Sequence, residues 1–284
     1  MLRSTALALA LALCAASRAQ AALRVVATTS DLGALASAVG RDKVTVTVLA
    51  SPTADPHHVE GASGKDALSN ADVLIESGAY LERDWLPALE DAAHNAKVAV
   101  GAPGRVLASY GLELIDVPET ASSHDPHPAG NSHFMMNPLV AGKVAQGLAV
   151  SLCNVDASSC DAYRQNAAAF QDAIDKKLRN WTLLVTPFKG STIVAFHPSW
   201  NYLASRFGLR TEDAETAKPG KGKILIVEPF QSRPMAESVA SRIGAVVVNA
   251  CQFPGCLPGT ENDYIALVDA DLNAIVAGLK AAKK

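Results

Sequence analysis

The chain has 284 residues, of which 49% are hydrophobic and 19% are charged, and its formal net charge at pH 7 is −3. This composition allows one large domain or two ordinary domains with apolar cores, and it argues against a disordered chain. The sequence has no basic patch with interleaved aromatic residues, so we expect no nucleic-acid partner.

Residues 1–21 have the pattern of a secretory signal peptide. Arg3 gives the positive start, residues 5–16 are apolar, and Ala-Gln-Ala at 19–21 is a small-x-small cleavage site. The apolar stretch is too short to span a bilayer comfortably. We therefore expect export to the periplasm with cleavage of this peptide. In the alternative, a lipoprotein, Cys14 would carry the lipid, but the bulky leucine before it disfavours that reaction.

Four cysteines remain after the predicted cleavage, in two local pairs, Cys153 with Cys160 and Cys251 with Cys256. An even number of cysteines in an exported chain predicts two short-loop disulfides. A metal site of four thiolates is the alternative. It is disfavoured because the spacings differ from those of zinc knuckles and because an oxidising compartment removes free thiols.

Strand and helix patterns alternate along the first half of the mature chain. Alternation of this kind predicts a parallel sheet covered by helices. We expect strands over residues 23–28, 44–49, 72–76 and 97–101, and the strongest helix over residues 79–95.

A long helix is predicted from Asp161 towards Thr186, because no Gly or Pro occurs before Pro187. At about 1.5 Å per residue it would extend ~35 Å or more, enough to connect two lobes rigidly. It follows a long polar loop over residues 118–134 and a helix that begins at Pro138.

The second half repeats the pattern of the first. Strands are expected over residues 191–196, 223–227 and 245–249, a polar loop over 211–222, and a last helix over about 263–280. The predicted fold class is therefore α/β, with a signal peptide (1–21), an N-terminal lobe (22–160), a connecting helix (161–187) and a C-terminal lobe (188–284).

Histidines follow predicted strands in both halves of the chain. His57 follows the strand 44–49, His197 follows the strand 191–196, and His133 lies in the long loop. Ligands of open α/β sheets bind at the carboxyl ends of strands. Three imidazoles and one carboxylate would complete a four-coordinate zinc site. The carboxylate is expected from residues 261–264, although Asp263 there is also suited to capping the last helix.

Three stretches of the chain resemble motifs of the periplasmic metal-binding proteins of zinc and manganese ABC importers, the cluster A-I solute-binding proteins. Residues 55–60, Asp-Pro-His-His-Val-Glu, resemble the family's Asp-Pro-His-x-x-Glu. Residues 195–202, Ala-Phe-His-Pro-Ser-Trp-Asn-Tyr, match its third motif. Residues 131–138 keep the histidine and last proline of Asp-Pro-His-x-Trp-x-Asp-Pro but change both aspartates, the first proline and the tryptophan.

The resemblance implies two pseudo-Rossmann lobes joined by one long helix, with a metal site in the cleft between them. It implies His57, His133 and His197 as ligands and a carboxylate before the final helix as the fourth. We assign Asp263 to this place. Because the family's aspartate aligns with Asn262, the remaining alternatives for the fourth donor are Glu261, Glu228 and water.

The resemblance also implies a monomeric receptor that captures Zn²⁺ and delivers it to an ABC-transporter membrane permease. Manganese members tend to have a carboxylate at the position of His197, and imidazole favours zinc. A Mn²⁺ receptor is the alternative. Zinc-type members often carry a long His-rich loop, which here would be reduced to His124 and His127. Such a loop would collect metal or receive it from a periplasmic metallochaperone, but we expect an exposed polar loop.

No enzyme motif is visible in the sequence, which has no Gly-rich phosphate loop, His-Glu-x-x-His helix or Gly-x-Ser-x-Gly elbow. We therefore expect a protein that is not an enzyme. The rival function is a secreted zinc hydrolase with Glu60 or Glu228 as general base. An adhesin or a metal-independent sugar receptor is a third possibility.

Overall fold

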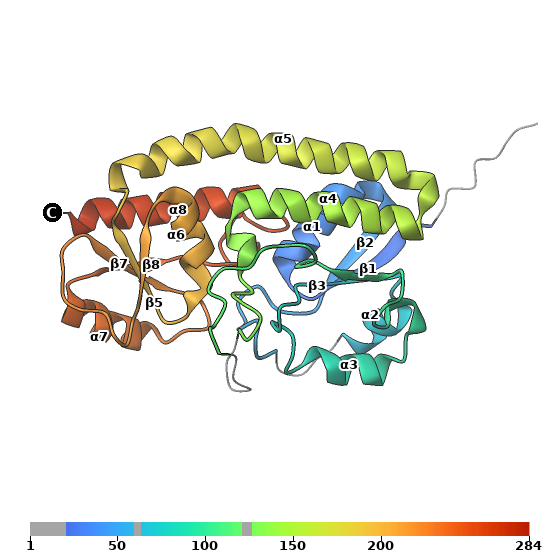
Figure 1. Ribbon diagram of the computed structural model, residues 1–284, viewed down its shortest axis with the longest axis horizontal. Helices are drawn as coiled ribbons and strands as arrows, with labels where there is room; N and C mark the ends of the chain where they lie inside the picture. Colours follow the sequence, from blue (N-terminus) through green and yellow to red (C-terminus); the bar gives the residue numbers. More distant parts are fainter. Residues whose placement is uncertain (1–20, 60–63, 121–126, 284) are drawn as a thin grey trace, which may run out of the picture.

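The computed structural model describes residues 21–59, 64–120 and 127–283. The signal peptide apart from Ala21, and also Glu60 and His124, lie outside the described residues. The described chain contains two four-stranded sheets side by side (Figure 1). The first comprises β1 (Leu23–Ala27), β2 (Val44–Val48), β3 (Val73–Glu76) and β4 (Arg105–Leu107); the second comprises β5 (Thr192–Ala195), β6 (Arg210–Asp213), β7 (Lys223–Val227) and β8 (Val246–Asn249).

Both sheets have the same topology, and every strand pair is parallel. The order is β2-β1-β3-β4 in the first lobe and β6-β5-β7-β8 in the second. The central strands are buried on both faces, which is why they contain apolar runs such as Ile-Leu-Ile-Val at 224–227 of β7. The predicted α/β class with two parallel sheets is confirmed.

Eight α-helices lie among the described residues. In chain order they are α1 (Ser30–Gly40), α2 (Lys65–Asn70), α3 (Leu86–Ala93), α4 (Pro138–Val155), α5 (Cys160–Val185), α6 (Asn201–Phe207), α7 (Arg233–Ile243) and α8 (Tyr264–Ala282). Pro138 occupies the first turn of α4, where its missing N–H costs nothing, and the Asn137 side chain caps that helix by accepting from the Leu139 amide.

Three predicted elements differ in the structure. Residues 97–101 form no strand, because Asn95 caps a short 3₁₀ turn there and the fourth strand is β4 at 105–107. The helix expected over 79–95 shortens to α3, since Gly78, Ala79 and Tyr80 all have positive φ. The polar segment after residue 210 begins with an edge strand, β6, whose side chains remain partly exposed.

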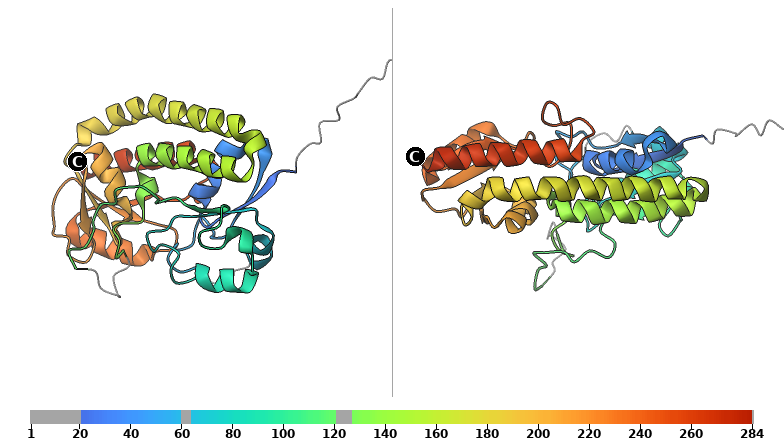
Figure 2. Two further views of the ribbon diagram at one scale, coloured as in Figure 1. Left: turned by 45° about the vertical axis from the view of Figure 1, so that its right-hand side comes forward. Right: turned by 90° about the horizontal axis from the view of Figure 1, so that it is seen from above.

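Helix α5 runs along the long axis of the molecule over both lobes (Figures 1 and 2). It packs against α1 and α4 of the first lobe and α8 of the second. One contiguous apolar core results, which includes Val25 and Ile75 from the first sheet and Ile193 and Ile224 from the second. The lobes therefore share buried surface in addition to the chain connection.

Both predicted disulfides are present. Cys153–Cys160 closes the turn between α4 and α5, with a Cα–Cα distance of 4.6 Å. Cys251–Cys256 closes a loop after β8, with a Cα–Cα distance of 6.5 Å. This second loop reaches the first lobe, where the Ser30 hydroxyl donates to the Pro254 carbonyl at 2.8 Å.

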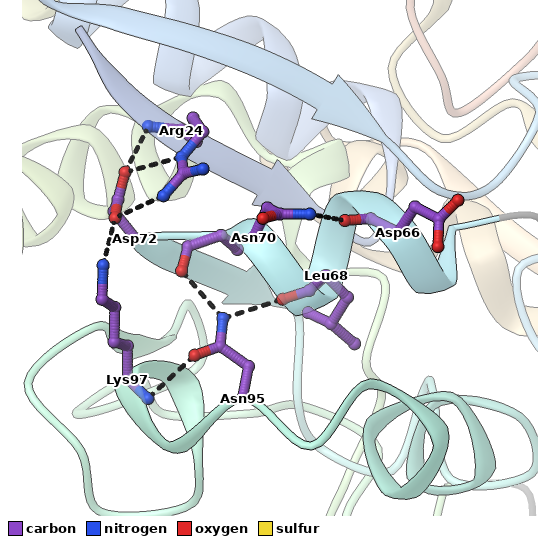
Figure 3. A network of polar contacts seen from close by, with 8 residues as sticks. Arg24, Asp66, Leu68, Asn70, Asp72, Asn95 and Lys97 are labelled. Carbon is purple, nitrogen blue, oxygen red and sulfur yellow. Dashed lines mark hydrogen bonds and ion pairs between the residues drawn. The ribbon is translucent and has the colours of Figure 1, made fainter. Parts of the chain in front are cut away.

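A polar network fixes the outer side of the first lobe (Figure 3). Asp72, just before β3, accepts hydrogen bonds from the Arg24 guanidinium and from Lys97 Nζ. The Arg24 guanidinium holds the pKa of Asp72 well below its usual range. Asn95 donates from Nδ2 to the Leu68 carbonyl at 2.8 Å. The connection after α3 is thereby tied to α2 and to the start of β3, which Asp72 joins to β1.

Two helical glycines provide a test of how closely α8 packs on the second sheet. A Cβ at Gly278 would lie 3.1 Å from Ile224 Cγ2 and even closer to Val248 Cγ2, and both neighbours are short, stiff, buried side chains. Gly278→Ala is expected to lower the free energy of unfolding by about 1–3 kcal/mol, because overpacking outweighs the gain in helix propensity.

Gly147→Ala on α4 is the matched control, since a Cβ there meets no atom within 4 Å. It is expected to raise the free energy of unfolding by about 0.5–1 kcal/mol. Urea denaturation of both variants measures the difference. Equal effects in the two variants would contradict the close packing of α8.

Candidate metal site

His57 lies in the loop that follows β2, at the carboxyl edge of the first sheet. Two contacts fix this loop: Trp85 Nε1 donates to the Pro56 carbonyl at 3.0 Å, and the His57 amide donates to Asp55 Oδ1 at 2.9 Å. Pro56 is buried and His57 is half-buried, whereas His58 is exposed. The structure thus directs His57, and not its neighbour, towards the interior.

His133 lies between β4 and α4, in a segment that the second lobe holds in place. The Asn131 side chain is fully buried; its Nδ2 donates to the Pro198 carbonyl at 2.8 Å, and its Oδ1 accepts from the His133 amide at 2.9 Å. The Tyr202 hydroxyl donates to the Asn131 carbonyl at 2.9 Å. The position of His133 is therefore set by residues from the opposite lobe.

His197 follows β5, at the carboxyl edge of the second sheet. Pro198 directly after it begins a 3₁₀ turn (Pro198–Trp200), which leads into α6. Because proline restricts the residue before it to extended backbone, His197 has φ −147° and ψ 150°. The strand ends at Ala195, and extended backbone at His197 brings the imidazole to His133 and His127 of the first lobe.

The three histidines predicted as ligands meet at one point, and His127 completes the group. The Nε2 atom of His197 lies 2.9 Å from that of His133 and 2.8 Å from that of His127, and the Nε2 atoms of His57 and His133 are 3.4 Å apart. All four ligand atoms lie within 4.8 Å of one another. With Zn–N bonds of about 2.0–2.1 Å, a tetrahedron has edges of about 3.3 Å. Three of the six separations are therefore near this edge length, and the group is compact enough to surround one ion.

Sequence reasoning missed His127, for which an exposed polar loop was expected. That expectation is wrong: the side chain is 5% exposed, and its Nδ1 lies 3.0 Å from the Ser132 hydroxyl. A signal was present in the sequence, because Asp-Pro-His at 125–127 repeats the Asp-Pro-His at 55–57. His124, the other histidine of the loop, lies outside the described residues.

The carboxylates weighed as fourth donor lie elsewhere. Asp263 is exposed and caps α8, where its Oδ1 accepts from the Ala266 amide at 3.0 Å. Glu261 is also exposed. Glu228 follows β7 and is buried, and its Oε2 accepts from Gln252 Nε2 at 2.7 Å. None of the three belongs to the histidine group that the described part of the chain forms.

Burial favours the uncharged form of three imidazoles of the group, His57, His133 and His197. Desolvation lowers the pKa of His57 to about 4, with a further contribution from His197. Desolvation also lowers the pKa of His133 well below its usual value, assisted by the three other rings, and it lowers the pKa of His197. Neutral imidazole is the form that binds metal, so these ligands need not lose a proton at neutral pH.

A cavity of about 320 Å³ opens onto the group from between the lobes. Its lining includes His57, His133 and His197, together with Phe196, Phe230 and Gln252. A route for a small ion therefore leads to three of the four imidazoles.

The low pKa of His57 predicts how the stability of the metal-free protein changes with pH. An unfolded histidine titrates near about 6.5, whereas His57 in the folded chain titrates at about 4. Between these pH values the unfolded chain binds more protons, so the His57 contribution to stability is present above the unfolded pKa and is lost as pH falls towards 4. We expect His57→Gln to lose less stability than the native protein between pH 7.5 and pH 5.

Urea denaturation of both metal-free proteins at the two pH values measures this loss. The variant must be compared with the native protein because other buried groups also change the stability in this pH range. Burial raises the pKa of Glu82 to about 7 and of Asp31 to about 6, and a carboxyl group with a raised pKa stabilises the fold as the pH falls. An identical pH dependence in the two proteins would show that His57 is not held neutral by the fold.

Fold and site together define a two-lobed α/β binding protein with a histidine group between its lobes. The chain belongs to the family described as zinc-uptake complex component A, periplasmic (ZnuA), whose model matches residues 25–278. The resemblance inferred from the three motifs is confirmed.

Individual relatives are more distant. The chain is 26% identical to the manganese-binding lipoprotein MntA of Bacillus subtilis over 197 residues, 67% of this chain and 60% of that protein. It is 24% identical to the zinc-binding lipoprotein AdcA of Streptococcus pneumoniae over 195 residues, 68% of this chain and 39% of that protein. These matches therefore span less than two thirds of either relative.

A similar fold occurs in a crystal structure of a ZnuA deletion mutant with zinc bound. The TM-score is 0.75 at 21% identity, and the match covers 90% of this chain and 98% of that chain. At this identity the likeness concerns the fold.

Proposed function

We propose that this protein is a periplasmic solute-binding receptor that captures Zn²⁺ through His57, His127, His133 and His197 and delivers it to an ABC-transporter membrane permease. The observation that carries the proposal is the convergence of four imidazoles from both lobes, whose ligand atoms all lie within 4.8 Å of one another. Family membership and the zinc-binding relatives support the same cargo.

Zinc is favoured over manganese by the chemistry of the donor set. The described histidine group contains four nitrogen donors and no carboxylate. Imidazole suits zinc, whereas manganese is better served by carboxylate, carbonyl and water oxygens in an octahedral arrangement. The manganese-binding relative is the reason to test this point directly.

Elemental analysis after purification without chelators or added metal tests the cargo. We expect about one zinc per chain, as a single four-ligand site requires, with manganese below stoichiometry. A chelator-competition titration should then give a far lower dissociation constant for Zn²⁺ than for Mn²⁺. Stoichiometric manganese with weak zinc binding would reverse the assignment to the manganese receptor.

A pair of variants separates the histidine group from the carboxylate alternative. His127→Ala is expected to weaken zinc binding by more than the roughly 10- to 100-fold that loss of an outer contact costs, because one of four ligands is removed. Asp263→Ala is expected to leave the zinc affinity unchanged and to lower the free energy of unfolding by about 1 kcal/mol, since it removes a helix cap.

Competition titration and urea denaturation of the two variants give these values. The opposite pattern, with weakened zinc binding in Asp263→Ala and native affinity in His127→Ala, would return the fourth ligand to the carboxylate.

The geometry does not favour a zinc hydrolase. Catalytic zinc needs an open coordination position beside a general base, and four imidazoles fill a tetrahedral shell. Of the two candidate bases, Glu60 lies outside the described residues, and Glu228 accepts a hydrogen bond from Gln252. A receptor function accounts for the filled shell more simply.

A further inference from the structure

Asp116 joins the segment that carries two histidines of the group to the second lobe. Its Oδ2 accepts hydrogen bonds from Asn131 Nδ2 at 3.0 Å and from Asn201 Nδ2 at 2.6 Å. Asn131 lies between His127 and His133 in the sequence, whereas Asn201 is the first residue of α6 in the second lobe. One carboxyl oxygen therefore connects this segment with α6.

The side chain of Asn131 continues this contact to the site. Its Nδ2 donates to Asp116 and also to the Pro198 carbonyl, and its Oδ1 accepts from the His133 amide at 2.9 Å. A carbonyl can only accept, so the contact with Pro198 fixes the orientation of the amide group whatever the charge of Asp116. The Asn131 side chain is also fully buried, and its three bonds leave it no other orientation without an unpaired polar atom.

Asp116 and Asn131 lie at the two ends of the stretch of chain that contains His127. These ends are close together, because the Asn131 amide donates to the Ile115 carbonyl at 2.8 Å. The Ile115 amide in turn donates to the Tyr202 hydroxyl of α6 at 3.1 Å. Asp116 has φ 54°, a backbone conformation that Asp, Asn and Gly adopt more readily than other residues. Both ends are thus held at α6.

We propose that Asp116 is a positioning residue that holds His127 and His133 against the second lobe. Its two asparagine partners carry the effect, one in the segment of the histidines and one in α6. Asp116 does not belong to the histidine group and would act only through these partners. Its effect on zinc affinity rests on the proposed function, whereas its effect on the segment does not.

Asp116→Gly tests the contact, because glycine keeps the positive φ without strain and lacks the carboxyl group. In the metal-free variant, NMR-detected hydrogen exchange of the His133 amide should be about 10-fold faster than in the native protein, since its acceptor is less firmly held. The His57 amide, which donates to Asp55, should exchange at the native rate.

Zinc binding by Asp116→Gly should be about 10-fold weaker in the competition titration. Asp116→Asn should restore most of the affinity, because an amide oxygen can accept both hydrogen bonds and asparagine tolerates the same backbone conformation. Asn95→Ala is the matched control. It also removes two side-chain hydrogen bonds, but on the outer side of the first lobe, and should leave zinc affinity and His133 exchange unchanged.

A double-mutant cycle separates positioning from a general loss of stability. In a His57→Ala background, Asp116→Gly should weaken zinc binding by the same factor as in the native protein, because His57 comes from another loop. In a His127→Ala background the factor should be smaller, because one of the two imidazoles that Asp116 positions is already absent.

Asn201→Ala removes the same contact from the side of α6 and covers the case in which Asp116→Gly does not fold. It should reproduce the faster exchange and the weaker binding. Native exchange of the His133 amide in these variants, native zinc affinity, or equal factors in the two histidine backgrounds would overturn the positioning role. Absence of zinc binding by the native protein would instead refute the proposed function, and the exchange rate would still decide whether Asp116 holds the segment.

Discussion

The site depends on one constraint: four imidazoles must be held together, with their ligand atoms within 4.8 Å of one another, although they come from both lobes. The rings do not hold one another in place, because uncharged rings attract one another weakly and their burial is costly without hydrogen bonds. The surrounding structure must therefore hold them. The shared core beneath α5 fixes the lobes relative to each other, and the contacts of Asn131 with Pro198 and Tyr202 fasten the segment with His127 and His133 to the second lobe.

The surroundings of the group also set its protonation. Burial lowers the pKa of His57, His133 and His197 below the usual value, so the rings are ready to bind a cation without losing protons. An outer contact is present as well, since the Ser132 hydroxyl lies 3.0 Å from His127 Nδ1. The metal binding proposed for this group would therefore depend on its surroundings as well as on the four rings.

Much of the fold and three members of the candidate site could be predicted from the sequence, because they follow from local pattern. His57 and His197 both follow strands, so each could be placed at the carboxyl edge of its own sheet. That the two edges face each other depends on how α5 and the shared core join the lobes. His127 could not be placed in this way, since its position depends on a segment held by long-range contacts such as that between Asn131 and Pro198. The sequence did not predict strands β4 and β6 for a related reason. Both are short edge strands, and they are strands because they pair with a neighbouring strand, not because of their own composition.

A fourth imidazole, His127, in the place of the carboxylate expected from the sequence would change the effect of zinc binding on the protein's charge. A shell with an aspartate would cancel part of the charge of the ion, and protonated ligands would cancel more by releasing protons. Burial lowers the pKa of His57, His133 and His197, so these rings need not release protons when the proposed cargo binds. Zinc capture as proposed would therefore add positive charge at the junction of the two lobes and change the electrostatic potential there.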